Sequence, residues 1–373
     1  MMSKFDLTYA TVDSLSEGVG SSQIVPLMEK LANHGMKINL LTFEKEDPSI
    51  ALKDRMAKSG IAWTQIQFGM SGPLGGMART IQLARLIPDS LITHARSDFP
   101  AVAARISGQK RILWDVRSLW ADQRKFIEES PIKRSILSLY APLEEVACNS
   151  SLALSTLTKA VVPILEARHK RLPSIRTVVP TAVDLERFQF SPLMPSKLKG
   201  LYSGTYNKYY NLDLSRRFID ELRKFVSCEV DWARPRESKT TSLNAGEDHS
   251  FSITQSEMAN LMSEYSFGMS ICKEDAGPSL KAAMPTKIAE FLAIGRPVVV
   301  NAGLGDCDEL LAKNGAGVII SRNDDLELKA KELIELIHDK KSPQRCRNLA
   351  ESHFDLNKGV RSYLESYDAL RTI

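Results

Sequence analysis

The sequence predicts an α/β protein with parallel sheets, divided into two domains. Its 373 residues are too many for one comfortable core and suit two domains of roughly 150 to 200 residues each. A first strand candidate (residues 5–12) is followed by apolar residues at helical spacing and then by a second strand candidate (residues 36–43). A strand–helix–strand unit favours a parallel sheet. Periodicity stops in a proline-rich stretch at residues 180–195, and we place the domain boundary there.

The overall composition excludes several classes of function. The net charge of +4 is too small to indicate nucleic-acid binding, although it permits affinity for an anionic membrane surface. The five cysteines are scattered without metal-ligand spacing, which favours a reduced interior. We find no secretory signal and no run of about 18 apolar residues that could span a membrane. We therefore expect a cytoplasmic protein that is either soluble or peripheral at the inner face of the membrane.

A loop with two glycines follows the first predicted strand. Gly18 and Gly20 begin like the dinucleotide fingerprint G-x-G-x-x-G, but Gln23 occupies the position of the third glycine, so the fingerprint fails. The loop is then either a flexible connection or a place where the backbone approaches a ligand closely.

Polar side chains lie at or just past the ends of two consecutive predicted strands. His94 and Arg96 follow the strand at residues 91–93, and Asp115 and Arg117 lie at the end of the strand at residues 111–116. Open parallel sheets bind ligands at the carboxyl ends of their strands. Each side chain taken singly could cap a helix or form a salt bridge, but four together at this edge favour a ligand-binding site.

The stretch at residues 277–301 (GPSLKAAMPTKIAEFLAIGRPVVVN) predicts a loop, a short helix and a core strand. Thr286 is the expected N-cap, Gly295 suits the left-handed position after the helix, and Val298–Val300 form a buried parallel strand. A helix N-terminus suits a phosphate, and Glu290, off the apolar stripe, suits ribose hydroxyls. The alternative is an ordinary amphipathic helix with a solvated Glu290.

Three segments carry a resemblance to a known family. The pattern P-T-K-x-x-E-x-x-A-x-G-x-P-V-V, from Pro285 to Val299, resembles the nucleotide-sugar site of retaining GT-B glycosyltransferases of family 4 (glycosyl transferases group 1). Residues 180–188 (PTAVDLERF) resemble the interdomain signature of that family. The pair HARS…DVRSLWAD resembles one of its branches, although many members carry His at the position of Arg117.

The resemblance implies a GT-B fold, in which two Rossmann-like α/β/α domains face a central cleft. Residues 1–184 would bind the acceptor, with a C-terminal helix at about 354–373 crossing back, and residues 185–353 would bind the nucleotide sugar. The catalytic set would be His94, Arg96, Asp115 and Arg117. The donor site would comprise Gly18, Gly20, Gly204, Lys208, Pro285, Thr286, Lys287, Glu290, Gly303 and Gly305.

Two departures from the family pattern bear on activity. Thr205 stands where members usually carry an arginine near the diphosphate, and Lys208 is the nearest ammonium. Ala282 stands where members carry an acidic residue eight positions before Glu290. Both departures favour the alternative of a catalytically inactive binding protein. A nucleotide-sugar epimerase is a further alternative, but it needs a set of catalytic carboxylates in the cleft that the sequence does not supply.

The resemblance implies a retaining glycosyltransferase without a cofactor. We expect it to be metal-independent, because no DxD-type carboxylate pair follows a strand. Lys208, Lys287 and helix N-termini would hold the diphosphate of a UDP- or GDP-sugar substrate. The acceptor would be a glycan or a lipid-linked molecule of cell-surface polysaccharide or glycoconjugate synthesis. Basic residues at 124, 125, 133 and 134 form either a solvated face or a patch that meets anionic lipid at the inner face of the membrane.

Overall fold

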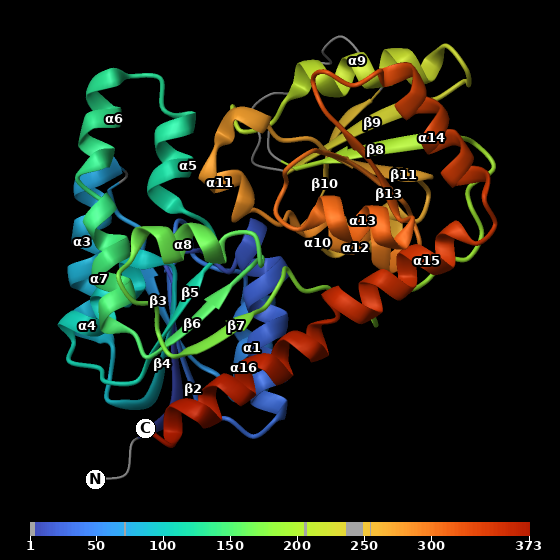
Figure 1. Ribbon diagram of the computed structural model, residues 1–373. Helices are drawn as coiled ribbons and strands as arrows, with labels where there is room; N and C mark the ends of the chain where they lie inside the picture. Colours follow the sequence, from blue (N-terminus) through green and yellow to red (C-terminus); the bar gives the residue numbers. More distant parts are fainter. Residues whose placement is uncertain (1–3, 71, 205–206, 236–248, 254) are drawn as a thin grey trace. The chain divides into compact units, whose positions relative to one another are not determined.

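The computed structural model describes residues 4–70, 72–204, 207–235, 249–253 and 255–373 (Figure 1). The chain forms two compact units. Unit 1 comprises the chain up to Val179 together with Asn357–Ile373, and unit 2 comprises Pro180–Leu356. Each unit is described by itself. Among the described residues, no helix is both long and apolar enough to cross a membrane.

Unit 1 contains a seven-stranded sheet in which every paired strand is parallel, in the order β3-β2-β1-β4-β5-β6-β7. The strands are β1 (Phe5–Ala10), β2 (Ile38–Glu44), β3 (Ala62–Gln67), β4 (Ser90–Arg96), β5 (Ile112–Val116), β6 (Ala153–Thr156) and β7 (Ile175–Val178). The helices are η1 (Gly20–Ile24), α1 (Val25–Asn33), α2 (Ile50–Lys58), α3 (Gly72–Leu86), α4 (Asp98–Ile106), α5 (Trp120–Ile127), α6 (Pro131–Ser138), α7 (Ala141–Ser150), α8 (Val162–Arg168) and α16 (Leu356–Arg371).

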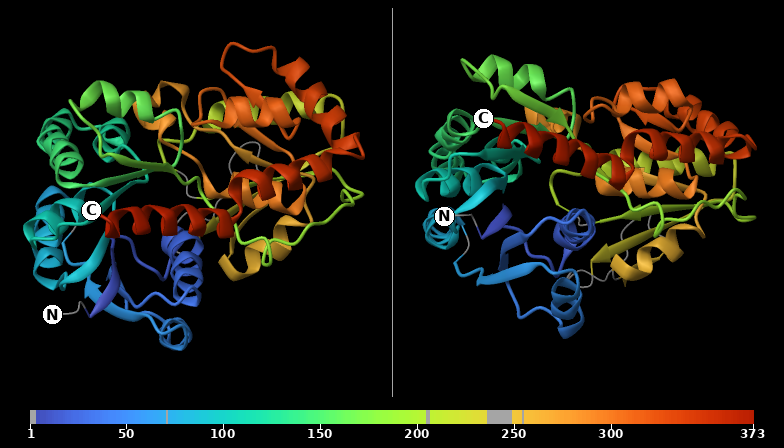
Figure 2. Two further views of the ribbon diagram at one scale, coloured as in Figure 1. Left: turned by 60° about the horizontal axis from the view of Figure 1, so that its bottom comes forward. Right: turned by 90° about the horizontal axis from the view of Figure 1, so that it is seen from below.

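Helices cover both faces of this sheet. Figures 1 and 2 show α1 and α16 on one face and α3, α4 and α7 on the other. Strands β2, β5 and β6 are buried throughout, and β1 and β4 are buried except at their first two residues, as expected for parallel strands between two helical layers.

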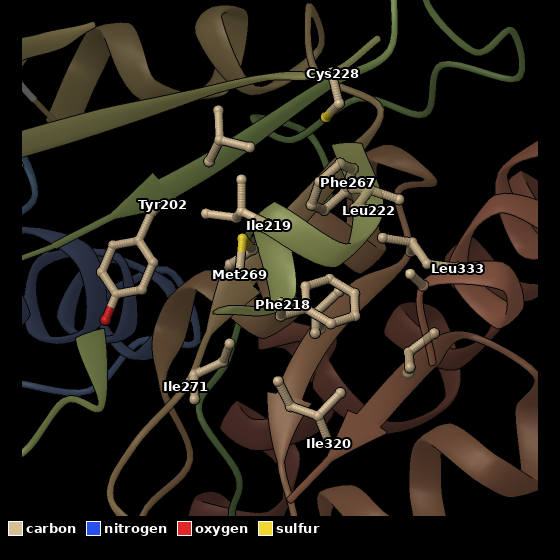
Figure 3. Close-up of a cluster of buried hydrophobic side chains, with 14 of the residues drawn as sticks. Tyr202, Phe218, Ile219, Leu222, Cys228, Phe267, Met269, Ile271, Ile320 and Leu333 are labelled. Carbon is tan, nitrogen blue, oxygen red and sulfur yellow. The ribbon is translucent and has the colours of Figure 1, made fainter. Parts of the chain in front are cut away.

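Unit 2 contains a six-stranded parallel sheet in the order β10-β9-β8-β11-β12-β13. Its strands are β8 (Lys199–Ser203), β9 (Glu229–Pro235), β10 (Ser250–Ile253), β11 (Phe267–Ser270), β12 (Val298–Asn301) and β13 (Gly317–Ile320). Its helices are α9 (Leu212–Arg223), α10 (Gln255–Met262), η2 (Glu274–Ala276), α11 (Pro278–Lys281), α12 (Thr286–Ile294), α13 (Cys307–Asn314), α14 (Leu326–His338), α15 (Ser342–Leu349) and η3 (Ala350–Phe354). Figure 3 shows part of its core, where Phe218, Ile219 and Leu222 of α9 gather with Met269 of β11.

The strand order reverses direction once in each sheet. In unit 1 the chain moves outward from β1 to β3 and returns to the other side of β1 with β4; in unit 2 it does the same around β8, returning with β11. Ligands of open parallel sheets bind beside such a reversal, outside the carboxyl ends of the strands. Both units are therefore Rossmann-like, as predicted.

The stretch at residues 277–301 folds largely as expected. Gly295 adopts a left-handed conformation (φ 92°) after α12, and β12 is buried between β11 and β13. The capping prediction was wrong by one position, because Thr286 is the first helical residue and Pro285 precedes it without a side-chain cap. Every residue of α12 after Thr286 is buried, Lys287 and Glu290 included, which excludes the alternative of a solvated Glu290.

The segment after Val179 is bound tightly to unit 2. Arg296 is fully buried and donates hydrogen bonds to the carbonyl oxygens of Ser191 (2.8 Å) and Leu193 (3.0 Å). Arg347 donates to the Phe188 carbonyl oxygen (3.0 Å). The boundary between the units therefore falls at residues 179–180, five positions before the boundary placed from the sequence.

Candidate active site

A buried ammonium group lies at the carboxyl edge of the unit 2 sheet. Lys287, in the first turn of α12, is only 8% exposed. Its Nζ lies 5.1 Å from the ring centroid of Tyr202 at the end of β8 and 4.7 Å from that of Tyr210. Within the described part of the chain, this nitrogen has no hydrogen-bond partner. The two aromatic faces stabilise the cation, but they leave its three N–H groups unsatisfied.

Gly204 makes room for this ammonium group. It follows β8 directly and adopts φ 127°, a conformation that disfavours any other residue. A Cβ at this position would lie 2.8 Å from Lys287 Nζ. The predicted donor residues Gly204 and Lys287 are therefore neighbours, and a side chain at position 204 would displace the cation.

Burial lowers the pKa of Lys287 to about 8, although the nearby Cys272 and Glu290 act to raise it. At pH 7 an ammonium with that pKa is still about nine-tenths protonated. An unneutralised buried cation is costly unless an anion or hydrogen-bond acceptors approach it. The geometry therefore provides an anion-binding position at the N-terminus of a helix, where the positive end of the helix dipole also attracts an anion.

Glu290 lies one turn beyond Lys287 on α12 and is also buried. Positions three apart lie on one side of a helix, and the charge of Glu290 acts on Lys287. The two residues expected to meet the diphosphate and the ribose are thus brought together. The ribose contact of Glu290 itself stays a prediction.

The other donor residues predicted for unit 2 are placed differently. The Gly303 N–H donates to both carboxylate oxygens of Asp308 (3.1 and 2.9 Å), and the Gly305 N–H donates to the Leu280 carbonyl oxygen (3.0 Å). These two N–H groups are therefore engaged within unit 2. Lys208 is exposed in the turn before Tyr210, which forms an isolated β-bridge with Cys272. Pro285 and Thr286 form the start of α12, and Thr205 lies outside the described residues.

The four polar residues predicted at the strand ends of unit 1 meet in one buried network. His94 Nε2 lies 3.2 Å from Asp115 Oδ2, Arg96 Nη1 lies 3.8 Å from the same oxygen, and Arg117 Nη1 lies 3.6 Å from Asp115 Oδ1. His94 and Asp115 are fully buried. Arg96 Nε also donates to Asp13 Oδ2 (2.9 Å), so two guanidinium groups face two carboxylates.

Two tyrosines of α16 complete this network, and the sequence analysis missed both. The Tyr367 hydroxyl lies 2.6 Å from His94 Nδ1. The Tyr363 hydroxyl donates to Asp115 Oδ1 (3.3 Å) and accepts from Arg117 Nη1 (3.2 Å). Their i, i+4 spacing on one side of the last helix was the available signal, but it does not specify a polar partner.

The network fixes the protonation state of His94. Burial lowers the pKa of its imidazole, outweighing the opposing effect of Asp115. Burial acts to raise the pKa of Asp115, but Arg117, His94 and Arg96 outweigh it and hold that pKa below its ordinary value. A neutral imidazole with its proton on Nε2 faces Asp115 Oδ2 at 3.2 Å and accepts at Nδ1 from the Tyr367 hydroxyl. The Nε2–Oδ2 contact is electrostatic, because neither atom makes a hydrogen bond of normal geometry within the described residues. The catalytic role assigned to the four residues stays a prediction.

The predicted glycine loop of unit 1 is held by a carboxylate that the sequence analysis also missed. Glu44, at the end of β2, accepts from the Ser14 hydroxyl (2.5 Å), the Leu15 N–H (3.0 Å) and the Ser16 hydroxyl (3.2 Å). A Cβ at Gly20 would lie 1.7 Å from the Ser14 carbonyl oxygen, so only glycine fits. Gly18 adopts φ 51°. The loop is therefore a defined turn at the carboxyl edge of the sheet and not a loose connection.

Comparison with known proteins identifies the fold. No family model matches the chain, and no curated protein matches it. Sucrose-phosphate synthase from Thermosynechococcus elongatus is similar in structure, with a TM-score of 0.71, 13% identity and 98% of each chain covered. A glycosyltransferase from Rickettsia africae gives a TM-score of 0.69 at 16% identity, with 98% of each chain covered. The chain has the GT-B fold.

A third similar structure was solved with a donor. The HepE protein of Anabaena in complex with UDP-glucose gives a TM-score of 0.68 at 12% identity, covering 99% of this chain and 100% of that one. At such low identity, the likeness to these three structures shows a shared fold and nothing about which sugar or acceptor is used.

We predict that Tyr367→Phe destabilises unit 1 by about 1 to 3 kcal/mol, because the buried His94 Nδ1 loses the hydroxyl that donates to it. Urea unfolding followed by tryptophan fluorescence measures the change. Tyr140→Phe is the matched control, since the Tyr140 side chain is buried but makes no hydrogen bond within the described residues. Equal stability of Tyr367→Phe and the control would contradict the network.

We also predict a pH dependence that belongs to His94. Because folding lowers its pKa from the ordinary 6.5, its contribution to stability is complete above pH 6.5 and is lost as the pH falls toward the folded-state pKa. The loss approaches about 1.4 kcal/mol per pH unit. The difference in unfolding free energy between the wild type and His94→Gln should therefore shrink below pH 6.5. A difference that is constant from pH 7 to pH 5 would show that His94 does not titrate in this way.

Proposed function

We propose that the protein is a glycosyltransferase that moves a sugar from a nucleotide-sugar donor to an acceptor. The observation that carries this proposal is the buried ammonium of Lys287, which lacks a hydrogen-bond partner among the described residues at the carboxyl edge of the unit 2 sheet. A donor diphosphate would supply the missing acceptors and the compensating charge. The shared fold with glycosyltransferases, one of them solved with UDP-glucose, supports the choice of a nucleotide sugar over other anions.

In this proposal the donor diphosphate lies at the start of α12. Lys287 would donate to its oxygens, Lys208 would approach from the turn after β8, and the unpaired N–H groups of the helix N-terminus would complete the site. Glu290, one turn further, would accept hydrogen bonds from the ribose hydroxyls. The donor contact of Gly18 and Gly20 stays a prediction.

We propose that transfer retains the anomeric configuration and needs no metal ion. The charge that develops on the leaving diphosphate would be stabilised by Lys287, Lys208 and the helix dipole. In a front-face displacement, the bond from the anomeric carbon to the leaving phosphate oxygen breaks while the acceptor oxygen attacks from the same side. The leaving oxygen then takes the acceptor proton, so no protein base is required.

The acceptor would bind at the carboxyl edge of the unit 1 sheet. Arg96 and Arg117 keep small exposed areas there, whereas His94 and Asp115 are fully buried. The arginines would contact the acceptor, and the buried pair would hold them in position. A guanidinium fork suits a carboxylate or phosphate, which favours an acidic or pyrophosphate-linked acceptor of glycoconjugate synthesis in the cytoplasm.

A GT-B protein that binds a nucleotide sugar without transferring it is the second candidate. The observation that favours it is Ala282, a buried methyl group at the position where the resembled family carries a carboxylate. Incubation with UDP-glucose and GDP-mannose separates the two candidates. Slow release of UDP or GDP supports the transferase, and tight binding without release supports the binding protein.

We predict that Lys287→Met weakens UDP binding roughly 10- to 150-fold, the equivalent of about 1.5 to 3 kcal/mol for a hydrogen bond to a charged group. Uridine binding should change little, because the nucleoside lacks the diphosphate. Calorimetric titration measures both affinities. Lys313→Met, at an exposed position of α13, is the control and should bind UDP like the wild type. Equal losses for UDP and uridine would remove Lys287 from the diphosphate site.

We further predict that donor hydrolysis or transfer continues in excess EDTA, because cationic side chains take the place of a metal ion in this proposal. The rate with EDTA is compared with the rate in added magnesium or manganese. Abolition by EDTA with recovery on metal addition would refute metal independence without affecting the assignment of Lys287.

A further inference from the structure

Ser97 has an unusual backbone conformation just past the carboxyl end of β4. With φ 82° and ψ 178°, it is the only non-glycine residue with a positive φ in the described part of the chain. This combination of φ and ψ is occupied almost exclusively by glycine, because a Cβ there crowds the residue's own backbone. The conformation of Ser97 therefore costs free energy that a glycine at this position would largely avoid.

The surroundings of Ser97 hold it in this conformation. The Ser97 N–H donates to the Asp115 carbonyl oxygen (2.9 Å). The side chains on either side of it, Arg96 and Asp98, are both buried, and Asp98 Oδ1 accepts a hydrogen bond from Trp114 Nε1 (3.1 Å). A strained residue persists where its neighbours determine the path of the backbone in this way.

The hydroxyl group of Ser97 makes no bond within the described part of the chain that would offset this strain. Ser97 occupies the N-cap of α4, where a serine side chain commonly accepts a hydrogen bond from the first turn, but no such bond forms. Its hydroxyl group bonds to no other described residue either. The side chain is partly exposed at the carboxyl edge of the sheet. A strained residue with an unused polar group is typical of a ligand-binding position.

An unmatched hydrogen-bond donor lies close to Ser97. Strands β4 and β5 pair with Arg96 opposite Asp115, so Ser97 lies opposite Val116, one position before Arg117. The Nε of Arg117 is buried and has no hydrogen-bond partner among the residues that the structure describes. The Ser97 hydroxyl and the Arg117 guanidinium therefore offer unused hydrogen-bonding groups at the ends of two neighbouring strands.

We propose that Ser97 binds the acceptor, with its hydroxyl donating a hydrogen bond to a phosphate group that Arg96 and Arg117 also contact. This inference rests on the acceptor site proposed for unit 1 and narrows the class of acceptor. A phosphate presents three acceptor oxygens and a carboxylate two, so a hydroxyl beside two guanidinium groups favours a phosphate or pyrophosphate over a carboxylate. The backbone strain is the cost of placing a serine, instead of a glycine, at this point of the site.

Binding of inorganic pyrophosphate tests the proposed contact. The affinity is measured by calorimetry in the Lys287→Met protein, so that the ammonium of unit 2 makes no contribution. We expect pyrophosphate to bind this protein, and the further substitution Ser97→Ala to weaken binding at least roughly tenfold, as for a lost hydrogen bond to a charged group. Ser59→Ala, which removes a hydroxyl at the end of α2, is the control and should leave the affinity unchanged.

The variant Ser97→Gly separates the hydroxyl from the strain. It should raise the melting temperature by about 2 °C or more, because glycine adopts a positive φ without strain, and yet weaken pyrophosphate binding as much as Ser97→Ala does. Ser97→Ala keeps the Cβ and should melt close to the wild type. A Ser97→Gly protein that binds pyrophosphate like its parent, or that is no more stable than the wild type, would overturn the proposal.

The variant Arg117→Gln distinguishes the role of Ser97 from the acceptor site on which it rests. If Arg117→Gln weakens pyrophosphate binding and Ser97→Ala does not, the contact with Ser97 is overturned and the acceptor site stands. If neither substitution weakens binding, or if pyrophosphate does not bind the Lys287→Met protein, both are overturned. Thermal unfolding shows whether Arg117→Gln folds, and Arg117→Lys, which keeps a positive charge, replaces it if it does not.

Discussion

A charge that leaves water must be compensated, and this constraint organises both units of the protein. In unit 1, Arg96, Arg117 and a neutral histidine surround the buried carboxylate of Asp115, and the partly exposed Asp13 pairs with Arg96. In unit 2, the ammonium of Lys287 is enclosed between two aromatic rings and lacks a hydrogen-bonding acceptor among the described residues. In unit 1 each charge has an opposite charge within 4 Å, whereas the ammonium of Lys287 has no hydrogen-bond acceptor among the described residues, as expected of a site that binds an anion.

This contrast separates structural residues from ligand-binding ones. Removing either partner of the His94–Asp115 pair leaves the other partner buried without its contact. We therefore expect such a substitution to lower the stability of the folded state before it affects ligand binding. The same pair holds Arg96 and Arg117 at the edge of the sheet, and Tyr363 and Tyr367 of α16 close the network over it. The C-terminal residues are therefore part of the unit 1 core. Lys287, in contrast, contributes a charge that burial makes costly, and such costs are typical of binding sites.

The sequence was sufficient to predict the elements that depend on residues close together in the chain. Gly295 ends α12 in a left-handed conformation, as a glycine before Arg296-Pro297 indicates, and the apolar run Val298–Val300 forms a buried parallel strand. The strand–helix–strand unit at the start of the chain predicted a parallel sheet, and β1 and β2 are paired in parallel. The resemblance carried by the segment from Pro285 to Val299 identified Lys287 and Glu290, and the structure buries both beside each other.

The contacts that the sequence could not supply join residues far apart in the chain. Tyr367 meets His94 across 273 positions, and Tyr363 meets Asp115 across 248, and no local pattern links them. The placement of Tyr202 and Tyr210 around Lys287 depends on how β8 and α12 pack. Gly303 was assigned to the donor from its position after a strand, but its N–H is taken by Asp308, whose role only the folded loop reveals. Thr286 was misplaced by one residue because Pro285 ends the preceding loop without a side-chain cap.

The most direct test of this account is the ionisation of Lys287 with and without a nucleotide diphosphate. Nitrogen-15 NMR of the lysine side chains follows each ε-ammonium through its titration, and the signal missing from Lys287→Met identifies the residue. We expect a pKa of about 8 in the free protein and a clear increase when UDP binds, because the diphosphate supplies the missing negative charge. A Lys287 pKa that stays the same when UDP is bound would contradict the assignment of this ammonium to the donor site.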